Sequence, residues 1–142
     1  GYGYNFLYRT FTLLYTNHMK EIEQEIKEYL IERNWYGQEP ADLAKSIMIE
    51  GAELLELFQW KNYSIEAINA DEKLKTNLKK ELADVLIYAI ELGIHLDIDI
   101  SEAIKQKLEH NRTKYPAEGV ADKDTGADFY MKQKMKYREV GE

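Results

Sequence analysis

The stretch that decides the fold is Asp42–Trp60, DLAKSIMIEGAELLELFQW, in which apolar residues recur every three or four positions. An α-helix turns by about 100° per residue, so residues at these spacings share one face. Leu43, Ile47, Leu54 and Leu57 would therefore form one apolar stripe along the helix. The pattern predicts an amphipathic helix that packs against other helices.

The same periodicity continues on both sides of this stretch. Pro40 and Pro116 lie where helices are expected to begin or end, and no segment alternates as a half-buried strand does. Long antiparallel helices joined by short connections predict an all-α protein of the four-helix-bundle type. The expected helices are Lys20–Arg33, Ala41–Trp60, Asp71–Leu96 and Ile100–Lys114, with a short turn after Ser64 and a short helix near Asp128–Tyr137.

Length, charge and cysteine content narrow the class of protein. A chain of 142 residues suits one domain, and its net charge of −7 argues against a general nucleic-acid-binding role. It has no cysteine, which excludes disulfides and thiolate metal sites and fits a reducing compartment. No run reaches the roughly 18–20 apolar residues of a membrane span. We therefore expect a cytoplasmic protein that binds neither nucleic acid nor a membrane.

The first eighteen residues differ in composition from those that follow. Gly1–His18 holds six aromatic residues, one Arg and no acid, whereas the chain from Met19 onward is rich in Glu and Lys. We expect residues 1–18 to be a cloning-derived leader, since a signal peptide would have a basic start and a continuous apolar run. The expected domain is then 19–116, followed by a polar C-terminal tail at 117–142.

Four carboxylates fall on faces that should be buried. In the expected helix Ala41–Trp60, Glu50 lies inside the apolar stripe and Glu53 borders it. In the expected helix Asp71–Leu96, Glu81 and Asp84 lie within the apolar stripe. One acid pair three residues apart is typical of a solvated face, but two pairs within apolar stripes are not. Buried carboxylates repel one another unless they share protons or bind cations. Oxygen ligands suit Mg²⁺ or Mn²⁺, and the lack of a His in register argues against a di-iron site.

Three segments together resemble the MazG-like all-α NTP pyrophosphatases, closest to their dCTP pyrophosphatase-like branch. They are Asp42–Trp60, ELADVLIY at Glu81–Tyr88 and KLEHNRTKYP at Lys107–Pro116. The resemblance implies a Mg²⁺-dependent hydrolase that converts an NTP or dNTP to the monophosphate and pyrophosphate, in nucleotide-pool house-cleaning. It also implies a homodimer or a dimer of dimers.

The resemblance also assigns residues to the site. The implied metal ligands are Glu50, Glu53, Glu81 and Asp84, with Glu56 nearer the periphery and Mn²⁺ as a substitute for Mg²⁺. The implied substrate contacts are Lys107, Asn111 and Lys114 for the phosphates and Trp60 and Tyr88 for the nucleotide, with Trp35 and Lys45 as further candidates. We expect Glu53 to be the catalytic base, because it lies at the edge of the stripe, where water reaches it. On the residues alone, the helix dipole accounts for Lys107 and Lys114.

Two departures from the family pattern bear on specificity. Ile49 replaces the first of two adjacent acids in the fuller MazG motif, and the His that some relatives place before the second helix is missing from Trp35–Pro40. The alternatives are a dUTPase-like or phosphoribosyl-ATP-type pyrophosphohydrolase of the same fold, or a non-catalytic helical interaction protein. His95 and His110 are expected to be structural or surface residues.

Overall fold

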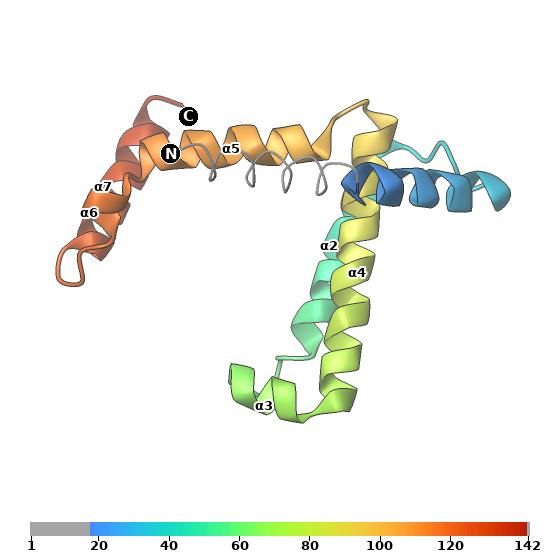
Figure 1. Ribbon diagram of the computed structural model, residues 1–142, viewed down its shortest axis with the longest axis horizontal. Helices are drawn as coiled ribbons and strands as arrows, with labels where there is room; N and C mark the ends of the chain where they lie inside the picture. The colour runs from blue at the N-terminus through green and yellow to red at the C-terminus, as the bar shows by residue number, and fades with distance from the viewer. Residues whose placement is uncertain (1–17, 142) are drawn as a thin grey trace, which may run out of the picture. The chain divides into compact units, whose positions relative to one another are not determined.

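The computed structural model describes residues 18–141, and all of their regular structure is helical (Figure 1). The expected leader therefore lies outside the described residues, apart from His18. The helices cover residues 18–32, then α2 (Pro40–Glu56), α3 (Ile65–Ala70), α4 (Glu72–His95), α5 (Ile100–Lys114), α6 (Ala117–Val120) and α7 (Gly126–Glu139). The prediction of an all-α chain is confirmed. The chain divides into two compact units, Gly1–Asp99 and Ile100–Glu142, which are described separately.

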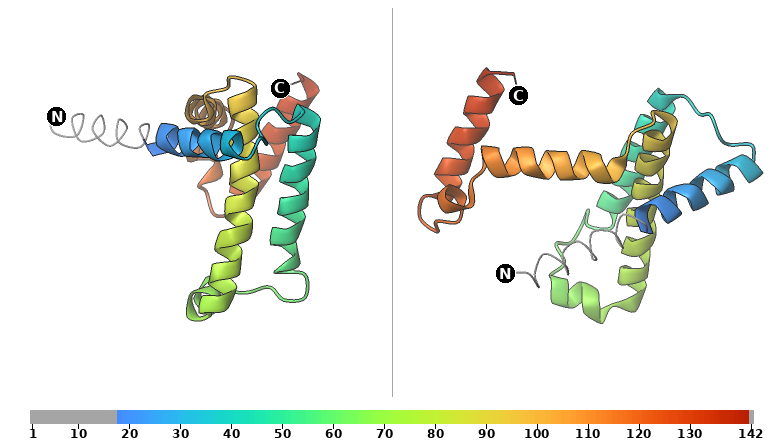
Figure 2. Two further views of the ribbon diagram at one scale, coloured as in Figure 1. Left: turned by 90° about the vertical axis from the view of Figure 1, so that its right-hand side faces the viewer. Right: turned by 45° about the horizontal axis from the view of Figure 1, so that its top comes forward.

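In the first unit, α2 and α4 run side by side (Figures 1 and 2). Pro40 occupies the first turn of α2, and Leu43 is fully buried, as the stripe predicts. The prediction that this helix reaches Trp60 is wrong, because the α-helix ends at Glu56. There the Phe58 N–H donates to the Leu55 carbonyl at 2.9 Å, a bond from three residues back that replaces the α-helical pattern with tight turns.

The helix over residues 18–32 packs on the C-terminal half of α4. Ile26 and Leu30 form a buried cluster with Ile90, and Met19 and Ile94 pack against it. The loop that follows is fixed to α4 through His95. The Gly37 N–H donates to His95 Nε2 at 2.8 Å, and Nδ1 of the same ring lies 2.9 Å from the Glu91 carbonyl. His95 is thus structural, as expected, and it determines where this loop lies.

Side-chain caps define the connection between α2 and α4. The Ser64 hydroxyl accepts from the Ala67 N–H at 3.1 Å, so the short turn expected after Ser64 is the six-residue helix α3. Asp71 Oδ1 accepts from the Leu74 N–H at 2.9 Å, which makes Asp71 the N-cap of α4. Capping therefore places the start of the second acid-bearing helix within one residue of the predicted start.

In the second unit, α7 contacts both α5 and α6. The rings of Tyr115 and Tyr130 stack with their centroids 4.7 Å apart. The tail helix is longer than the predicted Asp128–Tyr137 because it begins at Gly126, which is buried against the Val120 carbonyl. Within residues 18–141, no helix combines the length and the apolar content needed to cross a bilayer.

Candidate metal centre and the adjoining pocket

Three of the four predicted acids form a compact cluster between α2 and α4. One carboxylate oxygen from each of Glu50, Glu53 and Glu81 lies within 4.8 Å of the other two. Glu50 and Glu81 are half-buried, and Glu53 is exposed. The i, i+3 spacing on α2 and the side-by-side packing with α4 together bring these groups to one place.

The charges of this cluster act on one another. Burial raises the pKa of Glu50 above its ordinary value, and the negative charges of Glu53, Asp84 and Glu81 raise it further. Asp84, one turn beyond Glu81 on α4, is therefore electrostatically part of the group. An all-carboxylate donor set with uncompensated charge fits a hard divalent cation such as Mg²⁺ or Mn²⁺.

A pocket of about 420 Å³ adjoins the cluster through Asp84 and Tyr88. Helix 18–32, the loop after it and α4 all contribute to its lining. Of the predicted site residues, Trp35, Asp84 and Tyr88 line it together. Four polar or aromatic residues of the lining were not among the predicted site residues, and they are Glu25, Tyr29, Gln38 and Glu91.

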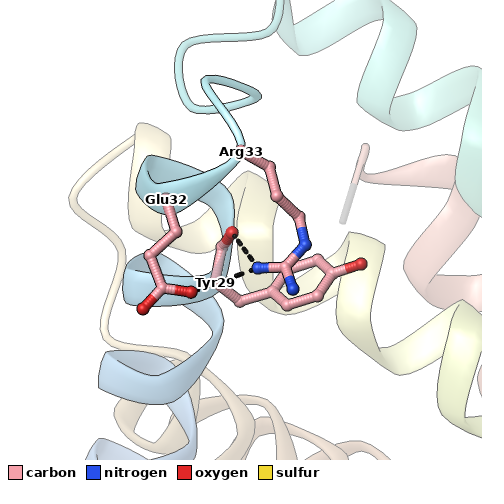
Figure 3. Close-up of polar contacts among 3 residues, drawn as sticks. All are labelled: Tyr29, Glu32 and Arg33. Atoms are coloured by element: carbon pink, nitrogen blue, oxygen red, sulfur yellow. Dashed lines mark hydrogen bonds and ion pairs between the residues drawn. The ribbon is translucent and has the colours of Figure 1, made fainter.

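Tyr29 and Trp35 form an aromatic wall of this pocket. Their rings meet edge to face, with centroids 6.0 Å apart and planes at 71°. The Arg33 guanidinium lies 3.9 Å from the Tyr29 ring centroid, donates to the Tyr29 carbonyl at 3.1 Å and pairs with Glu32 at 3.2 Å (Figure 3). These contacts hold the tyrosine in place and leave the Trp35 face for a planar ligand.

Tyr88 links the pocket to the acid cluster. Burial raises the pKa of its hydroxyl, and the charges of Glu50, Glu91 and Asp84 raise it further, while a hydrogen bond with Ser46 opposes them. The phenol is therefore neutral across the physiological range. It is a hydrogen-bonding group that lies between the acid cluster and the pocket.

Glu91 is the most deeply buried polar residue of the first unit. Its side chain is 1% exposed, and its Oε1 has no hydrogen-bond partner among the residues that the structure describes. Burial raises its pKa, against a smaller opposing effect of His95. Glu91 follows Asp84 by seven residues, the spacing of two helical turns, so periodicity could have placed it on the same face.

Other predicted contacts are not among the residues that line this pocket. Trp60 is 89% exposed in the turns after α2, and Lys45 is exposed and pairs with Asp42 at 2.8 Å. The three predicted phosphate ligands belong to α5 in the second unit, and they are Lys107, Asn111 and Lys114. There the Lys114 ammonium lies 4.5 Å from the Tyr137 ring centroid.

The chain is similar in sequence to proteins of a known family. A model of the MazG-like family matches residues 45–126, more than half of the chain. The chain is 34% identical over 100 residues to dCTP pyrophosphatase 1 of Mus musculus and 33% identical over 101 residues to that of Homo sapiens. These alignments cover 69% and 70% of the chain and 59% of each relative, so the chain spans about three fifths of the length of these relatives.

A solved structure is also similar. The crystal structure of a pyrophosphatase from Archaeoglobus fulgidus DSM 4304 is 42% identical and superposes with a TM-score of 0.61. The match covers 70% of this chain and 93% of that one, which supports the predicted all-α pyrophosphatase fold. Together, the family model, the relatives and the fold show that this chain belongs to the MazG-like family, near its dCTP pyrophosphatase branch.

Proposed function

We propose that the chain is a nucleoside triphosphate pyrophosphohydrolase that converts an NTP or dNTP to the monophosphate and pyrophosphate with a divalent cation. One observation carries this proposal: a three-carboxylate cluster lies beside an aromatic-walled pocket, with Asp84 and Tyr88 at their junction. A cation site next to a flat, partly apolar cavity suits a ligand that joins a polyphosphate to a base. The names of the relatives, dCTP pyrophosphatase 1 and pyrophosphatase, support the same reaction.

Each part of the site has a role in this reaction. When bound, Mg²⁺ or Mn²⁺ would neutralise phosphate charge and lower the pKa of a coordinated water. Glu50, Glu53, Glu81 and Asp84 would hold the ion, and Glu53, which is exposed, would also orient or deprotonate the attacking water. Water adds to the α- or the β-phosphorus, the bridging P–O bond between them breaks, and the monophosphate and pyrophosphate are released. The family resemblance adds Lys107, Asn111 and Lys114 of the second unit as phosphate ligands.

The pocket is the proposed base site. Its volume of about 420 Å³ falls within the ordinary range for small-molecule sites. Trp35 and Tyr88 stack on or border the base, and one such stacking contact contributes on the order of 1–3 kcal/mol. The exposed Trp60 and Lys45 would complete the site from another copy of the chain.

We also propose that the protein is a homodimer or a dimer of dimers. The described part of the chain buries few hydrophobic side chains, whereas Met48 and Leu55 on α2 are 72% and 68% exposed, and Leu82 and Leu86 on α4 are also exposed. A second copy would remove these apolar surfaces from water. Light scattering should give a mass of two or four chains at assay concentration. An active monomer would refute the assembly.

Pyrophosphate release from a panel of all NTPs and dNTPs with Mg²⁺ tests the reaction. We expect equimolar monophosphate and pyrophosphate, with dCTP among the better substrates. Release of inorganic phosphate alone, or no product from any nucleotide, would contradict the proposed reaction. A panel in which purine ribonucleotides clearly exceed dCTP would refute only the pyrimidine preference.

A further inference from the structure

Glu91 is a buried acid that the proposed reaction does not use. It lines the same pocket as Trp35 and Tyr88, on the face of α4 that carries Asp84 two turns earlier. Its carboxyl group is not a member of the three-carboxylate cluster. Its place in the pocket therefore needs an explanation separate from metal binding.

No described neighbour satisfies this side chain. Oε1 is buried without a hydrogen-bond partner, although His95 lies one turn further along α4. The His95 ring is already engaged, since Nδ1 meets the Glu91 backbone carbonyl and Nε2 accepts from Gly37. A buried polar atom without a partner lowers the stability of the folded state. Such an atom in a pocket is explained if a ligand supplies the missing donor.

The lining defines the kind of ligand. The described side chains that line this pocket include no Lys or Arg, so no protein cation pairs with Glu91 there. Tyr29, Trp35 and Tyr88 provide aromatic surface for a flat ring. The ligand therefore has to be planar and has to offer a hydrogen-bond donor on its edge.

We propose that Glu91 recognises the nucleobase by accepting a hydrogen bond from an exocyclic amino group and sharing a proton with the adjacent ring nitrogen. Cytosine and adenine carry this edge. Uracil and thymine reverse it, with a carbonyl acceptor in place of the amino donor and a ring N–H donor in place of the ring nitrogen acceptor. This inference rests on the proposed function, because the base enters the pocket attached to the triphosphate. Within that function, it makes Glu91 the residue that separates dCTP from dUTP.

The protonation of Glu91 agrees with this assignment. Burial raises its pKa, which favours the neutral carboxyl group, and that group presents one O–H donor beside one acceptor oxygen. The donor faces the ring nitrogen and the acceptor faces the amino group. A two-point contact of this kind discriminates between bases by roughly tenfold or more.

Three variants test the role of Glu91. Glu91→Gln keeps the size and offers an N–H donor beside an acceptor oxygen, as the neutral carboxyl group does, and Glu91→Met keeps the bulk without polar atoms. Glu72→Gln, at the exposed start of the same helix, is the matched control. The measurements are kcat/KM for dCTP, dUTP and dATP, with calorimetric binding of dCMP and dUMP in the absence of metal. A thermal melt of each variant confirms that it is folded.

We expect the wild type to prefer dCTP to dUTP. Glu91→Gln should keep most of this preference, whereas in Glu91→Met it should fall about tenfold or more. The change should appear mainly in KM and in dCMP affinity, and Glu72→Gln should match the wild type. A dUTP preference in the wild type, or an unchanged ratio in a folded Glu91→Met protein, overturns the inference and leaves the pyrophosphohydrolase intact. If no nucleotide is cleaved, the proposed function fails. The monophosphate titration then decides base recognition by itself.

Discussion

The two units use carboxylates in opposite ways. In Ile100–Glu142, the Asp122 carboxylate accepts from the N–H groups of Asp124 and Thr125 and from the Thr125 hydroxyl at 2.8–3.0 Å, and these bonds lower its pKa. In Gly1–Asp99, Glu50 and Glu91 lie against helix faces, and burial raises the pKa of each. An acid given backbone donors stabilises a turn. Acids left without donors destabilise the free protein and are explained by a ligand.

The largest effect should come from the acid cluster. Glu81→Gln removes one of the three carboxylates that lie within 4.8 Å of one another, so it should lower kcat/KM on the order of 10³-fold, since cation-based stabilisation is worth several kcal/mol. Glu72→Gln on the same helix should keep wild-type activity. In chelator, Glu81→Gln should melt no lower than the wild type, because one repelling charge is gone. A fully active Glu81→Gln enzyme would show that the cluster is not the metal site.

In the second unit, the largest effect should be steric. A Cβ on residue 126 would lie 2.4 Å from the Val120 carbonyl oxygen, so Gly126→Ala should destabilise the packing of α6 against α7 by about 1–3 kcal/mol. Hydrogen exchange of the α7 amides should quicken, and exchange in α4 should not. Ala127→Ser, at the exposed neighbouring position, is the control. Equal exchange in Gly126→Ala and in the control would contradict the close approach seen here.

Glu91 should change the free energy of unfolding by less than Gly126→Ala does. Its ionised form should be less stable in the folded state than its neutral form. Its folded pKa is raised, so the wild type is most stable, relative to Glu91→Gln, below the ordinary value of 4.5 and loses that advantage as pH rises through the folded pKa. The titratable groups near it are Asp84, Tyr88 and His95 on α4, with Glu25 and Tyr29 of helix 18–32 lining the same pocket. Melting curves in chelator from pH 4 to 8 measure the difference. A difference that stays constant with pH would contradict the raised pKa.

The smallest effect should come from Asp122, with the opposite sign. Its folded pKa is lowered, so its contribution to stability is present above the ordinary value of 3.8 and is lost as pH falls through the folded pKa. Asp122→Ala should therefore speed hydrogen exchange of the first α7 amides at neutral pH and have little effect in strong acid. Asp124→Ala, whose side chain makes none of these bonds, is the control. A variant without any effect at neutral pH would show that the turn does not depend on this carboxylate.

Helical periodicity explains what the sequence could predict. The two acid pairs were found because spacing alone puts Glu50 and Glu53 on one face and Glu81 and Asp84 on another, and packing of α2 on α4 then brings the faces together. The predicted start at Asp71 lies within one residue of the observed start of α4, where Asp71 is the N-cap. These features depend on local sequence, and they could therefore be predicted.

Features that depend on contacts between distant segments could not be predicted from the sequence. Glu91 is buried beside the pocket that helix 18–32 and the following loop help to form, and that loop is held by the bond from Gly37 to His95, 58 residues apart. The end of α2 at Glu56 was missed because the apolar pattern continues through Leu57 and Phe58 into the turns. Helical periodicity alone shows neither the long-range contact nor the tight turns that end the helix.

Pyrophosphate release from dCTP, in excess chelator and again after Mg²⁺ is restored, tests the central claim most directly. That claim is that the carboxylates between α2 and α4 hold the divalent cation on which the reaction depends. We expect release to fall to background in chelator and to recover with Mg²⁺ or Mn²⁺. Release that continues undiminished in excess chelator would contradict the account, because the acid cluster would then have no part in the chemistry.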